Sequence, residues 1–178
     1  MWVSGSQGRL GTEVCRQLAE AGHSVVGADI KPGITDPVDL LDRRAVADSL
    51  RDAEAIVHCA GISSPEGVEP AELVRVNTMT TFNALEEAWS AGIRTAVLAS
   101  SGSIYGTAWS PDPIDQPYLP VDEDSPLQYV DPYALSKDFL YCPASQLRTP
   151  LPGTAGGFDC ARAERVIGWL PRSRWRTG

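Results

Sequence analysis

Short apolar segments that alternate with helical segments are the feature that most constrains how this chain can fold. The first of them, Trp2 to Ser4, runs directly into the glycine-rich segment Gly5 to Gly11. Leu10, Val14 and Leu18 then recur at intervals of four residues, which predicts the buried stripe of a helix. A strand, a tight turn and a helix in this order are typical of the opening unit of a parallel α/β sheet.

The alternation continues through the first two-thirds of the chain. The further predicted elements are a buried strand over 24–29, a brief edge strand around Val38 and Asp39, a helix from about 42 to 51 with Val46 and Leu50 inward, a buried strand over 55–60, a helix over about 70–91 and a buried strand over 95–100. Strands separated by helices need right-handed crossovers and therefore a parallel sheet. The predicted fold class is α/β, with a doubly wound parallel sheet.

Composition narrows the class of protein. A chain of 178 residues suffices for one well-buried domain but is short for two. The net charge of −8 argues against a nucleic-acid surface. No apolar run approaches the roughly 20 residues of a membrane span, and the N-terminus lacks the pattern of a secretion signal. We therefore expect a cytoplasmic protein that binds neither nucleic acid nor membrane.

The cysteine and histidine pattern predicts no metal site. The 4 cysteines form no Cys-x-x-Cys pair, and the chain has only 2 histidines to complete a cage. Buried free thiols are the expectation for the cysteines.

Gly5 to Gly11 and Asp29 together predict a dinucleotide site. A glycine-rich turn before a helix presents free backbone N–H groups and the positive end of the helix dipole to a pyrophosphate. Asp29, at the end of the next strand, can accept bonds from both hydroxyls of the adenosine ribose and would repel a 2′-phosphate. We expect NAD rather than NADP, with NADP left open by the neighbouring Lys31. A strand–turn–helix without a ligand is the alternative.

Tyr133 and Lys137 are four residues apart on a helix expected to begin at about Pro132 and to stop at Pro143. Residues at this spacing share one face of a helix. A nearby ammonium favours the phenolate, so we expect Lys137 to lower the pKa of Tyr133 from about 10 toward neutrality, where the phenol can transfer protons.

The segment 99–106 carries three serines where a strand is expected to leave the sheet at its carboxyl edge. A serine hydroxyl in this place can bond a substrate oxygen whose charge changes during the reaction. A serine-rich turn with only local backbone bonds is the alternative.

With these motifs in this order, the chain resembles the extended short-chain dehydrogenase/reductase family, in its NAD-dependent epimerase/dehydratase branch. The resemblance covers residues 1 to about 141 and implies a Rossmann-like fold. It implies that Tyr133 is the catalytic acid and base, that Lys137 lowers its pKa and bonds the nicotinamide ribose, and that Ser101 is the catalytic serine. The cofactor-binding positions that it implies are Gly5, Gly8, Arg9, Leu10, Gly11, Asp29, Asp39, Ala60, Gly61, Tyr133 and Lys137.

The same resemblance also suggests roles for residues outside the catalytic and cofactor-binding positions. Ser103 is a candidate substrate contact, whereas Asn77 and His58 are expected to be structural. Asp39 resembles a carboxylate that meets the adenine edge, and an exposed acid on an edge strand is the alternative. The acidic run 122–124 is expected to be solvated or to order its loop rather than to act as a catalytic acid.

The residues after Ser101 narrow the expected reaction. Dehydratases of this family resemble one another in having an Asp-Glu pair after the catalytic hydroxyl, and here Gly102-Ser103 occupies that place. We therefore expect reversible hydride transfer, as oxidation or epimerisation of a sugar or sugar nucleotide, rather than dehydration.

The C-terminal part departs from the family pattern. Residues 1–141 are expected to form the NAD-binding domain with the catalytic residues, and 142–178 a remnant of a truncated substrate lobe. A homodimer remains open but is weakened by the short helix that carries Tyr133. Three readings follow: an active oxidoreductase or epimerase, a non-catalytic or impaired NAD-binding module, and a remnant of low stability.

Overall fold

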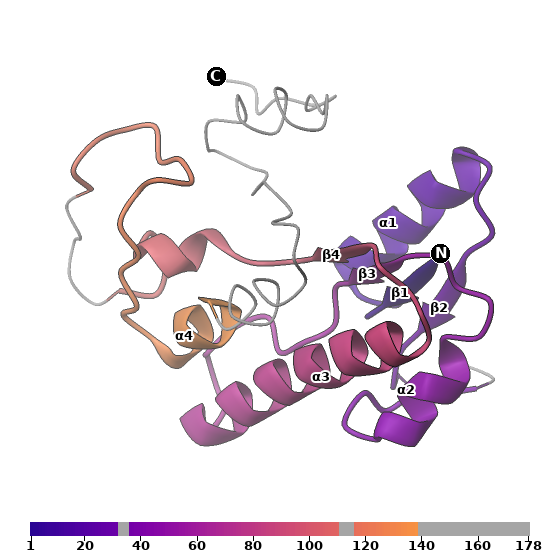
Figure 1. Ribbon diagram of the computed structural model, residues 1–178. Helices are drawn as coiled ribbons and strands as arrows, with labels where there is room; N and C mark the ends of the chain where they lie inside the picture. The colour runs from indigo at the N-terminus through magenta and orange to yellow at the C-terminus, as the bar shows by residue number, and fades with distance from the viewer. Residues whose placement is uncertain (32–35, 111–115, 139–178) are drawn as a thin grey trace.

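Within the part of the chain that the structure describes, four parallel strands form one sheet, in the order β2-β1-β3-β4 (Figure 1). The computed structural model describes residues 1–31, 36–110 and 116–138. The elements are β1 (Trp2–Ser4), α1 (Arg9–Glu20), β2 (Val26–Ala28), α2 (Arg43–Ser49), β3 (Ile56–His58), α3 (Pro70–Ser90), β4 (Ala96–Leu98), the 3₁₀-helix η1 (Gly102–Tyr105) and α4 (Pro132–Asp138). The predicted fold class is confirmed, whereas residues 142–178, expected to be a lobe remnant, lie outside the described residues.

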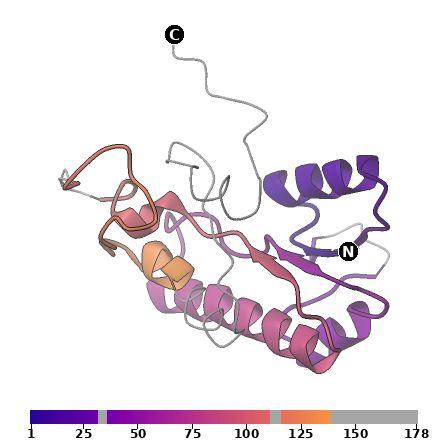
Figure 2. The same ribbon diagram turned by 45° about the horizontal axis from the view of Figure 1, so that its top comes forward.

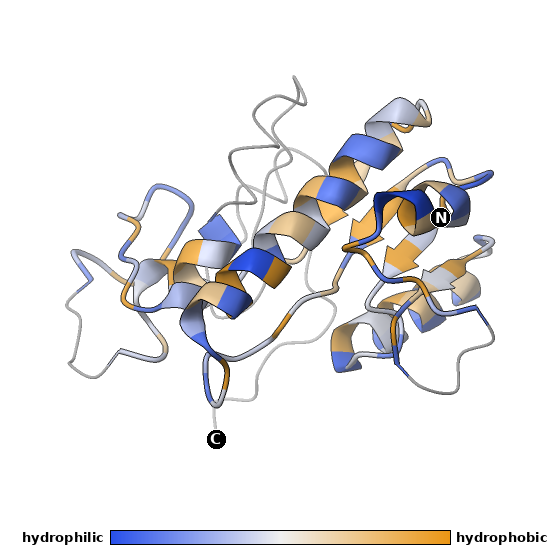
Figure 3. Ribbon diagram, turned by 90° about the horizontal axis from the view of Figure 1, so that it is seen from below, coloured by the Kyte–Doolittle hydropathy of each residue, from blue (hydrophilic) through white to orange (hydrophobic). Residues whose placement is uncertain are grey.

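Helices lie on both faces of the sheet. In Figures 1 and 2, α1 lies over one face, and α2 and α3 lie against the other. Trp2, Ile56 and Ala96 occupy one row of the sheet, because Trp2 pairs with Ile56 and Ile56 pairs with Ala96. This row forms a core cluster with Val46 of α2 and Leu85 of α3. Figure 3 shows the pattern behind this packing: the strands are mostly apolar, whereas the helices alternate between apolar and polar residues.

The outer strands differ from the prediction of fully buried strands. Val26 on β2 is 43% exposed and Val97 on β4 is 52% exposed, whereas Val3 on the central strand is fully buried. Both strands lie at the margins of the described sheet, where the helices cover less of the surface. The prediction of a buried strand is therefore correct for β3 and wrong for the outer two strands, β2 and β4.

The expected edge strand at Val38 and Asp39 does not form. The backbone N–H of Val38 donates to the carbonyl of Asp29 at 2.8 Å, but no ladder follows. Pro37 lacks a backbone donor, and the carboxylate of Asp39 accepts the N–H of Leu41 at 2.9 Å, which turns the chain toward α2.

The first turn of α1 also differs from the prediction. Leu10 is 54% exposed instead of lying inward, and Gly11 is the buried residue. A Cβ atom on Gly11 would lie 2.0 Å from the carbonyl oxygen of Gly5, so the helix turns its glycine, and no larger side chain, toward the preceding turn. Packing of the turn therefore overrides the spacing of the apolar residues.

We predict that Asp42→Ala destabilises the protein by about 1 kcal/mol, because the carboxylate caps the N-terminus of α2. It accepts the N–H of Arg44 at 2.9 Å and that of Ala45 at 3.3 Å. Urea unfolding measures the change. The control Glu54→Ala removes an exposed acid that caps none of the described helices. Equal stability of the two variants would contradict the capping role.

Candidate functional site

The glycine turn and the end of β3 touch through their backbones. Gly5 has a φ of +66°, and a Cβ atom there would lie 2.7 Å from the nitrogen of Ala60. The turn closes with a bond from the N–H of Gly8 to the carbonyl of Gly5 at 2.9 Å. A side chain at Gly5 or Gly11 would separate these segments, so the glycines are required by close approach as well as by the turn.

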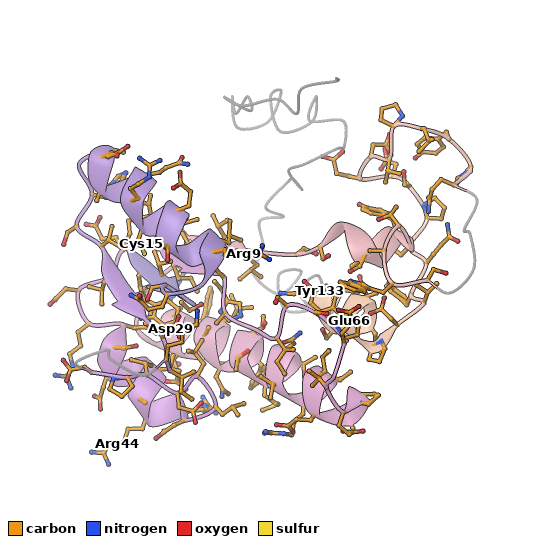
Figure 4. The ribbon with its side chains drawn as sticks, turned by 180° about the vertical axis from the view of Figure 1, so that it is seen from behind. Arg9, Cys15, Asp29, Arg44, Glu66 and Tyr133 are labelled. Atoms are coloured by element: carbon orange, nitrogen blue, oxygen red, sulfur yellow. The ribbon has the colours of Figure 1, made fainter. Side chains whose placement is uncertain are left out.

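The N-terminus of α1 opens toward the carboxyl edge of the sheet. Gly8 precedes the helix, and no side chain of the described residues caps it. The first hydrogen bond of the helix is donated by the N–H of Thr12 to the carbonyl of Gly8 at 2.9 Å. The N–H groups of Arg9, Leu10 and Gly11 belong to the first turn, whose N–H groups have no carbonyl partner within the helix, and Arg9 lies at this end of the helix in Figure 4.

Asp29 lies immediately after β2 and is nearly buried, at 7% exposure. One carboxylate oxygen accepts the N–H of Gln7 at 2.8 Å, and the other accepts the N–H groups of Ile30 and Lys31 at 2.8 and 3.1 Å. The ammonium of Lys31 returns to the carbonyl of Gln7 at 2.6 Å. Asp29 therefore fixes the glycine turn to the end of the second strand, and its charge lies beside the turn.

The serine segment and Tyr133 meet at the other side of this edge. The Oγ atom of Ser101 accepts the hydroxyl of Ser103 at 2.9 Å and its N–H at 3.2 Å. The Ser101 side chain also lowers the pKa of the Tyr133 phenol, which indicates that the two side chains lie near one another. Ser103 is only 2% exposed, so the structure places it behind Ser101.

Helix α4 is held in place by its own cap and by α3. The carboxylate of Asp131 accepts the N–H of Ala134 at 2.8 Å and so caps the first turn. Asn77 of α3 donates from its side-chain nitrogen to Ser136 at 3.0 Å. The expected stop at Pro143 lies outside the described residues.

The pKa of Tyr133 differs in direction from the prediction. Burial raises it, a bond from Ser101 lowers it, and the charge of Asp131 raises it. Lys137 lies 5.7 Å from the centroid of the phenol ring, but its ammonium donates to the carbonyl of Ala99 at 3.1 Å. The lysine is therefore directed to the backbone rather than to the phenolic oxygen, so the expected lowering of the pKa is wrong for this structure.

Lys137 itself is 7% exposed, and burial lowers its pKa to about 8. The charge of a nearby Cys59 thiolate would act in the opposite direction. Near neutral pH the lysine is thus mostly charged but close to the point at which it loses its proton.

Asn77 joins this half of the site to the loop after β3. Its side-chain oxygen accepts the N–H of Ile62 at 2.7 Å, and its nitrogen donates to the carbonyl of Ile62 at 3.1 Å. Gly61, immediately before Ile62, has a φ of +145°, and a Cβ atom there would lie 2.9 Å from the side-chain oxygen of Asn77. The structural role predicted for Asn77 is confirmed.

Two buried residues of the site were missed from the sequence. Ser4 and Thr81 bond the two ring nitrogens of His58 at 2.8 and 3.0 Å. The signal was present, since Ser4 is a polar residue ending an apolar strand and Thr81 follows Asn77 by one helical turn.

The remaining acidic candidates lie outside this cluster. Asp39 is exposed in the loop before α2. In the run 122–124, the carboxylate of Asp122 accepts the hydroxyl of Tyr118 at 2.6 Å, the hydroxyl of Ser125 at 3.1 Å and the N–H of Asp124 at 3.1 Å. This pattern confirms the loop-ordering role expected of the run.

Within the described ranges, His, Cys, Asp and Glu residues form no group of three or more that could hold a metal ion. Cys15 and Cys59 are free thiols. The same ranges contain no helix of the length and apolarity that a membrane span requires.

A family model described as the NAD dependent epimerase/dehydratase family matches residues 1–141. Among curated relatives, the UDP-glucose 4-epimerase of Mus musculus is 28% identical over 166 residues, which cover 78% of this chain and 46% of the relative. A putative UDP-glucose 4-epimerase of Methanocaldococcus jannaschii is 30% identical over 149 residues, covering 76% of this chain and 46% of the relative. The chain thus spans about half the length of the curated relatives that it matches.

Solved structures show the same likeness. A short-chain dehydrogenase/reductase superfamily protein of Agrobacterium tumefaciens with bound NAD is 31% identical, with a TM-score of 0.69 over 80% of this chain and 43% of that chain. The protein MoeE5, solved with UDP-glucose and NAD, is 25% identical, with a TM-score of 0.69 over 84% of this chain and 49% of that chain.

Because Lys137 is buried, we predict that the stability of the folded chain depends on pH. Its pKa is about 8 in the folded chain against a usual 10.5, so the unfolded chain binds more protons between these values and stability rises with pH there. We expect the free energy of unfolding to increase by about 1 kcal/mol between pH 7 and 9 relative to Lys137→Met. Urea unfolding across this range measures it, and parallel curves for the two proteins would contradict the assignment.

Proposed function

The chain belongs to the NAD-dependent epimerase/dehydratase family, and on that premise we propose that it binds NAD and transfers a hydride reversibly to and from a sugar nucleotide. The observation that carries this proposal is that the Ser101 segment, at the start of η1, contacts helix α4, which carries Tyr133. This segment lies at the same edge of the sheet as the open N-terminus of α1, because Ser101 follows β4 and the glycine turn follows β1 in a parallel sheet.

The residues at the glycine turn fit the dinucleotide. The first-turn N–H groups of Arg9, Leu10 and Gly11 suit a pyrophosphate, and the absence of a side chain at Gly5 and Gly11 leaves the turn close to the strand ends. The charged side chain of Arg9 would add a cation at this position. The carboxylate of Asp29 would accept the ribose hydroxyls. The backbone of Ala60 and Gly61 would form the opposite wall, and Asp39 would approach the adenine.

The bound nicotinamide would supply the hydride acceptor and donor. Tyr133 would accept and return the proton of the sugar hydroxyl, and the hydroxyl of Ser101 would bond the same oxygen. Ser103 would act by orienting Ser101, because its hydroxyl is buried and bonded to it. Lys137 would hold the nicotinamide ribose once its ammonium leaves the carbonyl of Ala99.

Two lines support a sugar nucleotide as the substrate. The mouse relative named above is a UDP-glucose 4-epimerase, and MoeE5 was solved with UDP-glucose. Gly102-Ser103 offers no carboxylate after Ser101, so oxidation or epimerisation suits the site better than elimination. Residues 1–141 would form the dinucleotide-binding unit that carries this chemistry.

A second candidate function is a dinucleotide-binding module without turnover. It is favoured by the raised pKa of Tyr133 and by the Lys137 ammonium, which donates to the carbonyl of Ala99 rather than to the phenol. A phenol with a raised pKa gives up its proton less readily near neutral pH, so the proton relay would be weaker. This candidate binds NAD and leaves UDP-sugars unchanged.

We predict that NAD binds at least about tenfold more tightly than NADP, because the charge of Asp29 opposes a 2′-phosphate. Asp29→Asn keeps one oxygen acceptor and removes the charge, so it should bring the two dissociation constants closer. Calorimetric titration measures both. Asp48→Asn, which removes an equal charge from α2, should leave the preference unchanged. Tighter NADP binding to the unmodified chain would contradict the assignment.

We predict that Tyr133→Phe binds NAD with an unchanged dissociation constant and loses at least about 100-fold in turnover, because the phenolic proton relay is removed. The assay follows conversion of UDP-glucose to UDP-galactose and the absorbance of NADH. Tyr118→Phe removes an exposed phenol of the loop before α4 and should retain turnover.

The outcomes of this assay separate the two candidate functions. Equal turnover by Tyr133→Phe and the unmodified chain would contradict the catalytic role. NAD binding without turnover by the unmodified chain would instead favour the binding module.

A further inference from the structure

His58 lies at the end of β3, is 2% exposed, and bonds through both ring nitrogens. Its partners come from two other elements. Ser4 ends β1 immediately before the glycine turn, and Thr81 lies on α3. The imidazole therefore connects the strand that leads into the turn with the helix that carries Asn77.

The positions of the protons in this chain of hydrogen bonds follow from the bond that Thr81 makes to the backbone of α3. The hydroxyl of Thr81 lies 2.8 Å from the carbonyl oxygen of Asn77, and a carbonyl can only accept. The proton of Thr81 is therefore committed to that carbonyl, so the threonine oxygen can only accept from His58. The Nε2 atom of His58 must then carry a hydrogen.

The proton on Nε2 determines the role of the other ring nitrogen, Nδ1, which faces Ser4. Burial and the charge of Lys137 lower the pKa of His58 to about 3, so the ring is neutral and holds one proton. With that proton on Nε2, the Nδ1 atom must accept from the hydroxyl of Ser4. The oxygen of Ser4 keeps its lone pair for the N–H of Ala60, which lies at 3.3 Å.

We propose that His58, as the neutral Nε2–H tautomer, is a positioning residue that holds the Ala60–Gly61 wall of the dinucleotide groove at its distance from the glycine turn. The directed chain runs from the N–H of Ala60 through Ser4, His58 and Thr81 to the carbonyl of Asn77. It fixes Ala60 at the point where Gly5 makes its backbone contact. Its effect on cofactor affinity rests on the proposed function.

Position 81 allows a matched test. Thr81→Val keeps the shape of the side chain but removes the acceptor for Nε2–H, whereas Thr81→Ser keeps the hydroxyl. Thr80→Val is the control, because the Thr80 hydroxyl is also buried and donates to helix carbonyls, that of Val76 at 2.8 Å and, at the longer distance of 3.3 Å, that of Asn77, without bonding His58 or Ser4. The three variants therefore separate the directed bond from the general cost of losing a buried hydroxyl.

Two measurements on the full chain do not depend on cofactor. Nitrogen-15 NMR of the imidazole should show a protonated Nε2 and an unprotonated Nδ1, with no titration of the ring between pH 5 and 8. Amide hydrogen exchange of Ala60 should be about tenfold faster in Thr81→Val than in the unmodified chain, and nearly unchanged in Thr81→Ser and Thr80→Val. An Nδ1–H tautomer, or equal acceleration in Thr80→Val, would overturn the proposal.

The third measurement is calorimetric titration with NAD below the melting temperature of every variant. The dissociation constant should rise about tenfold in Thr81→Val and return to within about twofold in Thr81→Ser. If Thr81→Val lowers the melting temperature but keeps its NAD affinity, His58 is merely structural and the proposal fails. If the unmodified chain binds no NAD, the proposed function fails, and the tautomer and the Ala60 exchange still decide the inference.

Discussion

The close contact between the backbones of Gly5 and Ala60 is the constraint on which the rest of the site depends. It brings the ends of β1 and β3 together, and a Cβ atom on Gly5 would lie 2.7 Å from the Ala60 nitrogen. Glycine costs conformational entropy in such a place, and the site offsets that cost with fixed bonds around the turn. Asp29 holds the turn from the side of β2, and Ser4 holds Ala60 from within the sheet.

Helix α3 connects the two halves that meet at this edge. Through Asn77 it bonds the loop after β3 and the helix of Tyr133 and Lys137, and through Thr81 it bonds His58 (Figure 4 shows Asp29 and Tyr133 in the separate halves). A shift of α3 would therefore move the loop after β3 and the Tyr133 hydroxyl together. The polar residues on the inner face of α3 thus set the geometry of the site, whereas its apolar residues pack on the sheet.

Much of this arrangement could be predicted from the sequence, because the spacing of apolar residues indicates helices and strands and the spacing of glycines indicates tight turns. Apart from the edge strand at Val38, the succession of strands and helices along the chain was predicted, as were the turn at Gly5 and the structural role of Asn77. Features decided by packing were not: Leu10 is exposed because Gly11 must face the turn, and Val97 is exposed because the described helices leave β4 partly uncovered. The pKa of Tyr133 was also mispredicted, because spacing along a helix does not show that the Lys137 ammonium bonds the carbonyl of Ala99.

A crystal structure of the chain grown with NAD tests the central claim most directly. The account predicts that the pyrophosphate lies on the N–H groups of Arg9 to Gly11 and the adenosine ribose on Asp29. It also predicts that the nicotinamide ring lies beside the hydroxyl of Tyr133. A dinucleotide bound away from the glycine turn, or a nicotinamide ring out of reach of that hydroxyl, would contradict it.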